Sequence, residues 1–403
     1  MRRWCFGLMG LMVCSAVLGP AKLDAADLAP LLKTLREVGH EGKGYRAATA
    51  AWAQLTEQGR VEQLPQILAA FDGAELLAVN WLRGAVDTIA ERQLQAQGKL
   101  PITLLESFLK EKQHDPRARR LAYEWIVRDD PTARERLIPG MLDDPSLELR
   151  RDAVARVLSA AEEALKQKNN EQALAGFRQA LDAARDLDQV KVVTEALKQL
   201  GRPVDLPRHF GFLQDWQLVG PFDNQSGNGF EMVYEPEKAA TSEPEKAIDL
   251  MASYATPDGS RRWSAHHTDD EYGNVDLNKA LGKHMAVAAY ALATFQSDRQ
   301  QPIELRLGSE SALKIWLNGK LLFSADVYHA NGTMDQYVGR GELKPGRNTL
   351  LLKICQNNQT ETWAQDWKFQ LRVCDALGKA VLATDRPGPK TAKKETVPPA
   401  SKE

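Results

Sequence analysis

The sequence predicts an α+β multidomain protein, in which an N-terminal all-α helical-repeat region is followed by an all-β antiparallel sandwich. From residue 27 to residue 200, apolar side chains recur at helical spacing almost without interruption. After Pro203 this spacing stops, and aromatic residues, glycine and asparagine become more frequent. Asn318-Gly319 then separates two runs of alternating apolar residues, which is the strongest short-range signal for a β-hairpin.

The length of 403 residues and the 43% content of hydrophobic residues fit two or three globular domains. The formal net charge is −2 and both signs are spread along the chain, so no basic surface for a nucleic acid is expected. We divide the chain into a signal peptide (1–25), a helical-repeat domain (26–203), a β-sandwich (204–385) and a disordered tail (386–403). The tail is rich in proline, lysine and glutamate and almost lacks large apolar residues.

Residues 1–25 have the three parts of a secretory signal peptide. Two arginines precede an apolar run from Trp4 to Leu18, and Ala25 is the small residue expected before a cleavage site. The run is shorter than the ~20 residues that a membrane-spanning helix needs, although a signal anchor is the alternative. A secreted or periplasmic protein, with no stable membrane span after signal removal, is therefore predicted.

Cys355 and Cys374 would be the two cysteines of the mature chain. Both lie in expected strands, each on the face opposite the larger apolar residues of its strand. If the two strands pair, the sulfur atoms lie on one face and can form a disulfide in an oxidising compartment. Two unpaired thiols are the alternative.

In the helical half, three segments that begin at Phe71, Gln113 and Leu142 share one pattern. Each has an aspartate followed by a turn residue and then a helix that carries arginine beside small and apolar residues. An arginine near such a turn can bond exposed carbonyl groups and neighbouring carboxylates. The third segment, with Asp144-Pro145 and Arg150-Arg151, resembles the HEAT repeat, although the spacing of the three aspartates is irregular.

Residues 161–186 resemble a single tetratricopeptide hairpin, with Asn169-Asn170 as its turn and Phe177 on its apolar face. Stacks of helical repeats generally hold another protein on their exposed concave face. These resemblances therefore imply a protein partner for the helical half. Gly201 and Pro203 end the last helix of this half.

In the second half, short strands with turns every 8 to 12 residues predict the sandwich. Strands are expected at residues 212–222, 285–295, 302–323 (interrupted by tight turns around Gly308 to Ser311 and at Asn318-Gly319), 349–355, 368–374 and 379–382. Long irregular loops are expected at residues 223–229, 234–247 and 264–274.

The order of four motifs in this half resembles the galactose-binding-like jelly roll. These motifs are Trp216-x-x-x-Gly220-Pro221-Phe222, Gly308-Ser309, Lys314-x-Trp316-Leu317-Asn318-Gly319-Lys320 and Leu343-Lys344-x-Gly346-x-Asn348. That module accompanies many secreted glycoside hydrolases. The resemblance implies a jelly-roll fold, and it leaves open whether the module binds sugar, holds a structural calcium ion or only packs against a neighbour.

Sugar binding requires an aromatic face for the C–H side of a pyranose and polar groups for its hydroxyls. The predicted ligand contacts are Trp363, Trp367, Asn358 and Asp366 in the loop 356–367, and Tyr328 in another loop, where His329 follows it. Tryptophan is also common in sandwich cores, so one of the two tryptophans is expected to pack there.

No catalytic residue is predicted, because the sequence contains no HExxH, G-x-S-x-G, phosphate-loop or dinucleotide glycine pattern. The cluster His266, His267, Asp269, Asp270 and Glu271 is interpreted as a solvated loop rather than a metal site, because crowded neighbours cannot all turn inward. No cofactor is predicted, although Asp223, Asn224 and Asn228 offer oxygen ligands for a structural calcium ion.

These observations favour an exported, non-catalytic scaffold or recognition protein that binds a protein partner, with a carbohydrate as a second candidate ligand. Two alternatives stay open. In the first, the chain is an accessory module of a glycan-degrading hydrolase, or itself such an enzyme. In the second, it is a purely structural protein of the cell envelope.

Overall fold

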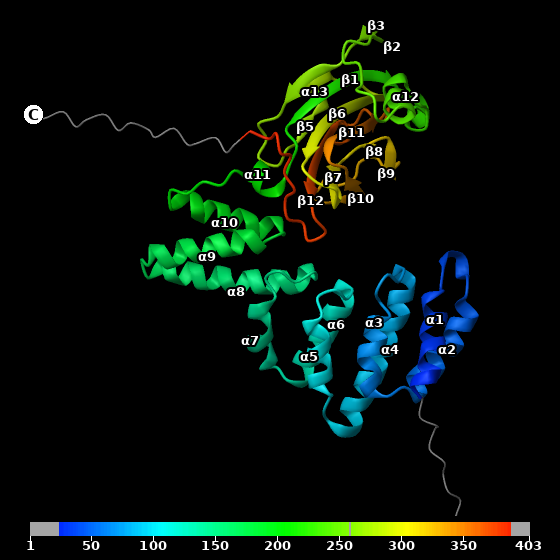
Figure 1. Cartoon of the computed structure of the whole chain (residues 1–403), viewed down its shortest axis with the longest axis vertical. Coiled ribbons are helices and arrows are strands. Elements are labelled where there is room, and N and C mark those ends of the chain that lie inside the picture. Colours follow the sequence, from blue (N-terminus) through cyan, green and yellow to red (C-terminus); the bar gives the residue numbers. More distant parts are fainter. Residues whose placement is uncertain (1–23, 258, 388–403) are drawn as a thin grey trace, which may run out of the picture. The chain divides into compact units, whose positions relative to one another are not determined.

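The computed structural model describes residues 24–257 and 259–387, so most of the predicted signal peptide and tail lies outside the described residues. Helices dominate residues 26–210 and antiparallel sheets dominate residues 215–374, which confirms the predicted fold class (Figure 1).

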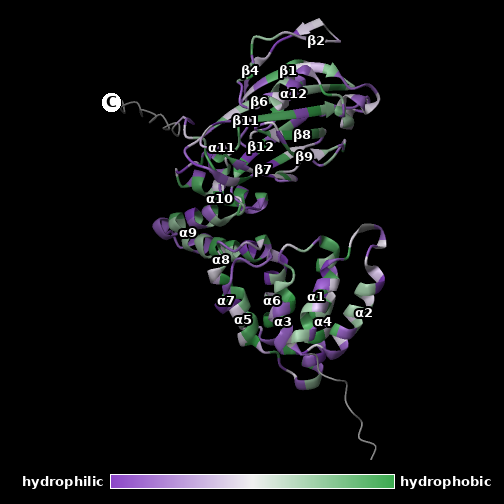
Figure 2. Cartoon of the chain, turned by 45° about the vertical axis from the view of Figure 1, so that its right-hand side comes forward, coloured by the Kyte–Doolittle hydropathy of each residue, from purple (hydrophilic) through white to green (hydrophobic). Residues whose placement is uncertain are grey.

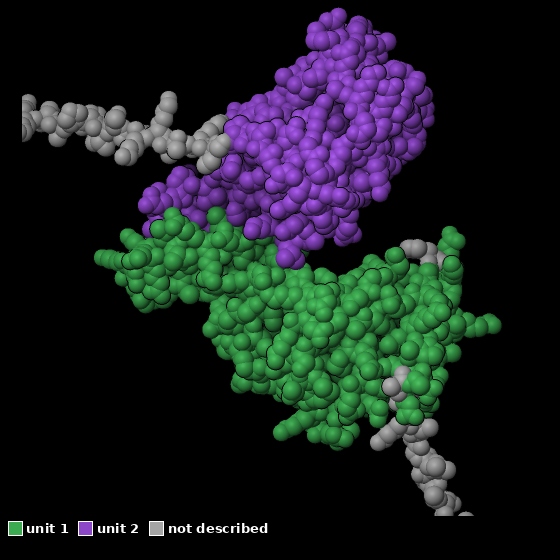
Figure 3. All heavy atoms as spheres, viewed as in Figure 1, with its two compact units in different colours: residues 1–189 green, residues 190–403 purple. Residues whose placement is uncertain are grey.

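The chain divides into two compact units, residues 1–189 and residues 190–403 (Figure 3). We call them the helical unit and the sandwich unit. The division lies inside helix α10, before the boundary expected at Pro203. The last part of α10 and the short helix α11 therefore belong to the sandwich unit.

The helices before the first strand are mostly short, as the sequence predicts. They are α1 (Ala25–Arg36), α2 (Tyr45–Gln58), α3 (Leu64–Ala69), α4 (Leu76–Gln97), α5 (Ile102–Lys110), α6 (Pro116–Asp129), α7 (Ala133–Leu137), α8 (Leu147–Lys166), α9 (Asn170–Ala183), α10 (Leu187–Gln199) and α11 (Leu206–Phe210). Three single 3₁₀ turns, His40–Gly42, Val61–Gln63 and Ile138–Gly140, lie between them. Among the described helices, none is both long and apolar enough to cross a membrane.

The core of the helical unit consists of the apolar stripes of these helices. Figure 2 shows apolar and polar residues alternating along them. Leu82, Val86 and Ile89 of α4 are buried together in one cluster, as their spacing predicts. Tyr45, at the first position of α2, is 56% exposed and does not belong to this core.

A buried ion pair connects successive helices of this unit. Arg119 of α6 donates from Nε to Oδ1 of Asp144 over 3.1 Å and from Nη1 to the carbonyl oxygen of Glu111 over 2.8 Å. The side chains of Arg119 and Asp144 are 0% exposed. The backbone N–H of Asp115 likewise donates to Oδ1 of Asp72 over 2.7 Å. The expectation that arginine near these turns bonds carbonyls and carboxylates is therefore confirmed for Arg119.

The sandwich unit contains two main sheets whose strands are antiparallel. The strands are β1 (Asp215–Asp223), β2 (Tyr254–Thr256), β3 (Gly259–Arg261), β4 (Ser264–His267), β5 (Val275–Asp276), β6 (Val287–Ser297), β7 (Gln301–Ser309), β8 (Ala312–Leu317), β9 (Lys320–Ala325), β10 (Tyr337–Leu343), β11 (Gly346–Gln356) and β12 (Lys368–Cys374). One sheet has the order β4-β1-β6-β11-β8-β9, the other β10-β7-β12-β5, and β2 pairs with β3 alone.

The core of the sandwich unit lies between the two main sheets. Ile315 of β8 and Leu371 of β12 come from different sheets, and both are 0% exposed in one shared buried cluster. The two sheets therefore pack face to face as a sandwich.

The hairpin predicted at Asn318-Gly319 joins β8 to β9. The φ angles of Asn318 and Gly319 are 50° and 78°, and this positive φ at both central residues is what the predicted turn requires. The alternation in β8 is also confirmed, because Ile315 faces the core between the sheets while Trp316 packs in a second cluster on the outer face.

All three expected loops contain some regular structure, so those predictions are wrong in part. Residues 223–229 overlap the 3₁₀ segment Gln225–Phe230. Residues 234–247 include helix α12 (Glu235–Ser242), in which Pro236 occupies the first turn, where proline is tolerated. Residues 264–274 begin with β4, which pairs with β1 and forms one edge of the six-stranded sheet. The short helix α13 (Leu277–Leu281) is a further element that the sequence analysis does not predict.

Cys355 and Cys374 are both buried and free. Cys355 lies on β11 of the six-stranded sheet, whereas Cys374 lies on β12 of the four-stranded sheet. The condition for the disulfide, that the two strands pair, is therefore not met.

The first residues of the expected tail contact the sandwich unit. Nη1 of Arg386 donates to the carbonyl oxygen of Phe212 over 3.1 Å, and Nη1 of Arg208 donates to that of Pro387 over 3.0 Å. Residues 388–403, which make up the rest of this segment, lie outside the described residues.

Candidate ligand-binding site

Two loops of the sandwich unit meet at one end of the six-stranded sheet. One loop, residues 326–336, follows β9, and the other, residues 357–367, follows β11. The C-terminal ends of β9 and β11 lie on either side of the start of β8. Cys355 of β11 pairs with Ala312 of β8, and Ala325 of β9 pairs with Leu313 of β8. The fold thus brings together two loops that are distant in the sequence.

The two loops are joined by a hydrogen bond and a ring contact. Nδ2 of Asn357 lies 2.8 Å from Nε2 of His329. The rings of His329 and Trp363 are edge to face, with their centroids 5.1 Å apart. We call Tyr328, His329, Asn357 and Trp363 the Trp363 site.

Trp363 and Trp367 have opposite environments. Trp363 lies in a 3₁₀ turn, Thr362–Ala364, and is 64% exposed, so its ring is open to a ligand. Trp367 is 0% exposed, and its Nε1 donates to the carbonyl oxygen of Ile354 over 3.3 Å. The expectation that one of the two tryptophans packs in the core is confirmed for Trp367, which corrects its assignment as a ligand contact.

Tyr328 is held in place by Asn224. Nδ2 of Asn224 donates to the Tyr328 hydroxyl oxygen over 3.1 Å and to the carbonyl oxygen of Gln356 over 3.0 Å. Burial raises the pKa of Tyr328 to about 12, although the bond from Asn224 opposes this shift. The hydroxyl of Tyr328 therefore keeps its proton at neutral pH and can act as a hydrogen-bond donor.

The orientation of Asn357 fixes the hydrogen-bonding role of His329. Oδ1 of Asn357 accepts from the backbone N–H of Gln359 over 3.2 Å, so its Nδ2 is the donor towards His329. Nε2 of His329 is consequently the acceptor of this hydrogen bond. The site thus presents polar groups of fixed direction beside an exposed aromatic ring.

The remaining predicted contacts lie around this site. Asn358 is exposed on the same loop as Trp363. Asp366 forms an ion pair with Lys368, whose Nζ lies 2.9 Å from Oδ2 of Asp366 and 3.1 Å from Oε1 of Glu310. Burial raises the pKa of Glu310, whereas the hydrogen bond from Lys368 lowers the pKa of Asp366. Two carboxylates therefore share one lysine beside the site.

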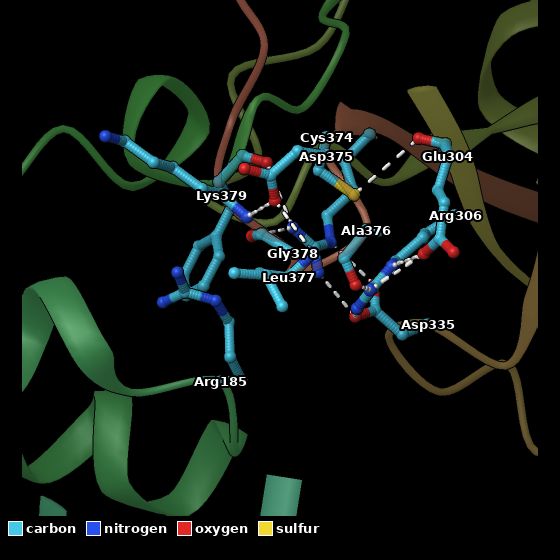
Figure 4. Close-up of polar contacts among 12 residues, drawn as sticks. Arg185, Glu304, Arg306, Asp335, Cys374, Asp375, Ala376, Leu377, Gly378 and Lys379 are labelled. Carbon is cyan, nitrogen blue, oxygen red and sulfur yellow. Dashed lines mark hydrogen bonds and ion pairs between the residues drawn. The ribbon is translucent and has the colours of Figure 1, made fainter. Parts of the chain in front are cut away.

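A buried network on the four-stranded sheet holds the loop 326–336 in place. Asp335 accepts from Nε of Arg372 over 2.6 Å and from Nη1 of Arg306 over 2.9 Å. Figure 4 shows Arg306 directed towards both Glu304 and Asp335. The pKa of Asp335 lies below its usual value. Burial alone would raise this pKa, but the hydrogen bonds and positive charges of Arg372 and Arg306 lower it by more.

Sequence reasoning missed the supporting residues Asn224, Glu310 and Asp335 in these roles. Their partners are distant in the sequence, so no local pattern identifies them. Of the calcium candidates, Asn224 directs its amide nitrogen towards Tyr328 and Gln356.

The polar cluster at residues 266–271 is spread over a strand and a turn. Nδ1 of His267 on β4 lies 2.6 Å from Oδ1 of Asp215, and Nε2 of His267 lies 3.4 Å from Oδ1 of Asp269. Oδ1 of Asp270 accepts from the backbone N–H of Tyr272 over 2.9 Å. Within residues 24–257 and 259–387, no group of three or more histidine, cysteine, aspartate or glutamate side chains is placed to hold a metal ion.

The helical unit contains an open groove of about 680 Å³ between α4 and α6. Trp125 lies in it, with Nε1 donating to Oδ1 of Asp87 over 2.9 Å and the guanidinium of Arg128 4.7 Å from its ring centroid. Ion pairs cross between the two helices, from Arg83 to Glu124 and from Arg128 to Glu91. The charges of this groove are thus largely paired.

Comparison with known proteins gives little further information. No family model and no curated protein matches the sequence. Among solved structures, an anti-sigma factor domain-containing protein is 12% identical with a TM-score of 0.24, over 32% of this chain and 42% of that chain. A β-glucosidase from Kluyveromyces marxianus is 10% identical with a TM-score of 0.25, over 45% of this chain and 21% of that chain.

A β-glucuronidase from Faecalibacterium prausnitzii is 15% identical with a TM-score of 0.21, over 36% of this chain and 21% of that chain. The chain thus spans less than half the length of each of these proteins. The similarity to glycosidase chains is weak, and at these TM-scores it carries no argument about function.

Proposed function

We propose that this chain is an exported recognition protein without catalytic activity, whose sandwich unit binds a carbohydrate at the Trp363 site and whose helical unit holds a protein partner. The observation that carries the proposal is the exposed ring of Trp363 beside polar groups of fixed direction. Export is supported by the sequence of residues 1–25 alone.

The chemistry of the Trp363 site suits a saccharide. An exposed indole ring can cover the C–H face of a pyranose, since large aromatic side chains supply a broad apolar contact area. The Tyr328 hydroxyl can donate a hydrogen bond, and exposed Asn358 can both donate and accept. Because His329 and Asn357 are already bonded to each other, little side-chain freedom is lost on binding.

For the sandwich unit, we propose a galactose-binding-like jelly roll. Two main antiparallel sheets around one core support it. The motif residues also lie at structural positions, with Trp216 buried on β1 and Asn318-Gly319 in the hairpin turn.

For the helical unit, we propose HEAT-like repeats followed by a tetratricopeptide-like hairpin. The Arg119–Asp144 pair between successive helices supports the first part. Close packing of α8 and α9 supports the second, because a Cβ built on Gly176 would lie only 2.8 Å from Cβ of Ala161. The groove between α4 and α6 is one exposed surface on which a partner can dock.

The test is the affinity of the purified chain for oligosaccharides, measured by titration calorimetry on a panel that contains neutral, acidic and amine-bearing glycans. Trp363→Ala is expected to lower the affinity at least about fivefold, as for a contact worth ~1 kcal/mol, without lowering the melting temperature. Tyr45→Ala, which removes an exposed aromatic ring from the helical unit, is the matched control. Unchanged affinity in Trp363→Ala would remove this loop as the site.

One rival is a glycan hydrolase, in which Glu310 and Asp366, the two carboxylates that share Lys368, would be the candidate acid–base pair. Turnover of any polysaccharide that disappears in Glu310→Gln would establish that rival. If no glycan of the panel binds and the chain captures an envelope protein, the purely structural alternative would be favoured.

A further inference from the structure

We infer that the Trp363 site selects saccharides that carry a positive charge, such as glucosamine-type oligosaccharides with free or methylated amines. This inference rests on the proposed carbohydrate binding and adds the charge class of the ligand. It follows from the charged groups around the site.

Besides Asp335, which is paired with Arg372 and Arg306, four carboxylates lie in or beside the loops of the site. Asp326 and Glu361 are exposed, and within the described part of the chain neither forms an ion pair. Glu310 and Asp366 share the single cation Lys368. The four negative charges are therefore balanced by one positive charge.

These carboxylates are close to the aromatic residues of the site. Glu361 precedes the turn that holds Trp363, and Asp366 follows it. The backbone N–H of Ala330, next to His329, donates to the carbonyl oxygen of Glu310 over 3.3 Å. Asp326 begins the loop 326–336 and lies two residues before Tyr328.

Other charged groups near the loops do not fully offset this excess. Arg306 and Arg372 pair with Asp335 and Glu304, and Arg340 also pairs with Glu304, so these three arginines offset only part of the excess. An anionic glycan would thus meet net repulsion, whereas a cation over the exposed Trp363 ring gains both Coulomb and cation–π attraction.

The experiment compares three oligosaccharides of equal length at neutral pH and low salt. One carries N,N,N-trimethylglucosamine, whose charge does not depend on pH, one is N-acetylated, and one is an oligogalacturonate. We expect the order of affinity to be cationic, then neutral, then anionic, and we expect the cationic advantage to shrink as salt screens the exposed charges.

Two variants remove single unpaired carboxylates. Asp326→Asn and Glu361→Gln should each lower the affinity for the cationic oligosaccharide about threefold, the size expected for an exposed charge pair. Their affinity for the N-acetylated oligosaccharide should not change. Glu342→Gln, at the opposite end of β10 from the loop 326–336, is the matched control.

The outcomes separate the two proposals. Binding of all three oligosaccharides with equal affinity, or tighter binding of the anionic one, overturns the charge selection but leaves carbohydrate binding intact. If none of the three binds, both the proposed function and the charge selection fail.

Discussion

Each unit of the molecule contains a buried arginine–aspartate pair, and the two pairs have different tasks. In the helical unit, Arg119 and Asp144 are both 0% exposed and connect α6 to the turn before α8. In the sandwich unit, Arg372 is 0% exposed and Asp335, at 21%, lies in the loop that carries Tyr328 and His329. The first pair stabilises a stack of helices, whereas the second also positions the candidate site.

Burial alone therefore does not show whether an ion pair contributes only to stability or also to ligand binding. Removing one member of either pair leaves an uncompensated buried charge, which is strongly destabilising. Only the loss of Asp335 should also change ligand binding, because only Asp335 is attached to a loop of the Trp363 site.

The largest effect is expected for Asp144→Ala. Because Arg119 would stay buried without its carboxylate, the free energy of unfolding should fall by about 3–5 kcal/mol, as measured by denaturant titration with far-ultraviolet circular dichroism. Glu135→Ala, which removes the exposed ion pair with Arg156, should cost less than about 1 kcal/mol. Equal losses of unfolding free energy in the two variants would show that the buried pair stabilises the fold no more than the exposed pair does.

Asp335→Asn should destabilise the sandwich unit by about 3 kcal/mol and also weaken saccharide binding. The asparagine keeps the shape of the side chain but not the charge that Arg372 and Arg306 require. Hydrogen exchange of residues 326–336 should become faster than in the wild type. Asp144→Ala should leave saccharide affinity unchanged, and equal loss of affinity in both variants would contradict the distinction between the pairs.

A smaller effect is expected from pH. The pKa of Asp335 is lowered in the folded state, so the stability it contributes is present above the usual aspartate pKa and is lost as the pH falls through the lowered value. Unfolding free energies measured over an acid series should therefore fall less steeply in Asp335→Asn than in the wild type, and parallel curves would refute this role.

The same two pairs show how far the sequence can be interpreted. Arg119 and Asp144 lie 25 residues apart, but each belongs to a segment with the same aspartate-turn-arginine pattern, so the sequence predicts that arginines near these turns bond carbonyls and carboxylates without naming the partner. Asp335 has no such pattern, because Arg306 and Arg372 lie 29 and 37 residues away along the chain. Charged residues buried by distant partners cannot be identified from local spacing.

The two tryptophans of the loop 357–367 give a second lesson. Trp367 continues the inward alternation of Phe369, Leu371 and Val373, all of which lie in the core between the sheets. The sequence therefore contains the signal that separates Trp367 from Trp363. The position of Trp363 beside His329 depends on sheet pairing and has no sequence signal.

Helix α12 shows a third limit of the sequence. The charges and prolines of residues 234–247 favour a loop. Glu237 of α12 is nevertheless buried, and its charge is compensated there, because it accepts a hydrogen bond from Tyr290 over 2.8 Å and pairs with Lys353 over 3.2 Å. Those partners lie on β6 and β11, far along the chain.

Indole N–H signals in a ¹⁵N nuclear magnetic resonance titration with oligosaccharide test the Trp363 site most directly, with assignments from Trp363→Phe and Trp367→Phe. The Nε1–H signal of Trp363 should move and saturate, while that of Trp367, which is bonded to Ile354, should stay in place. A bound oligosaccharide that leaves the Trp363 signal unmoved would contradict the proposed site.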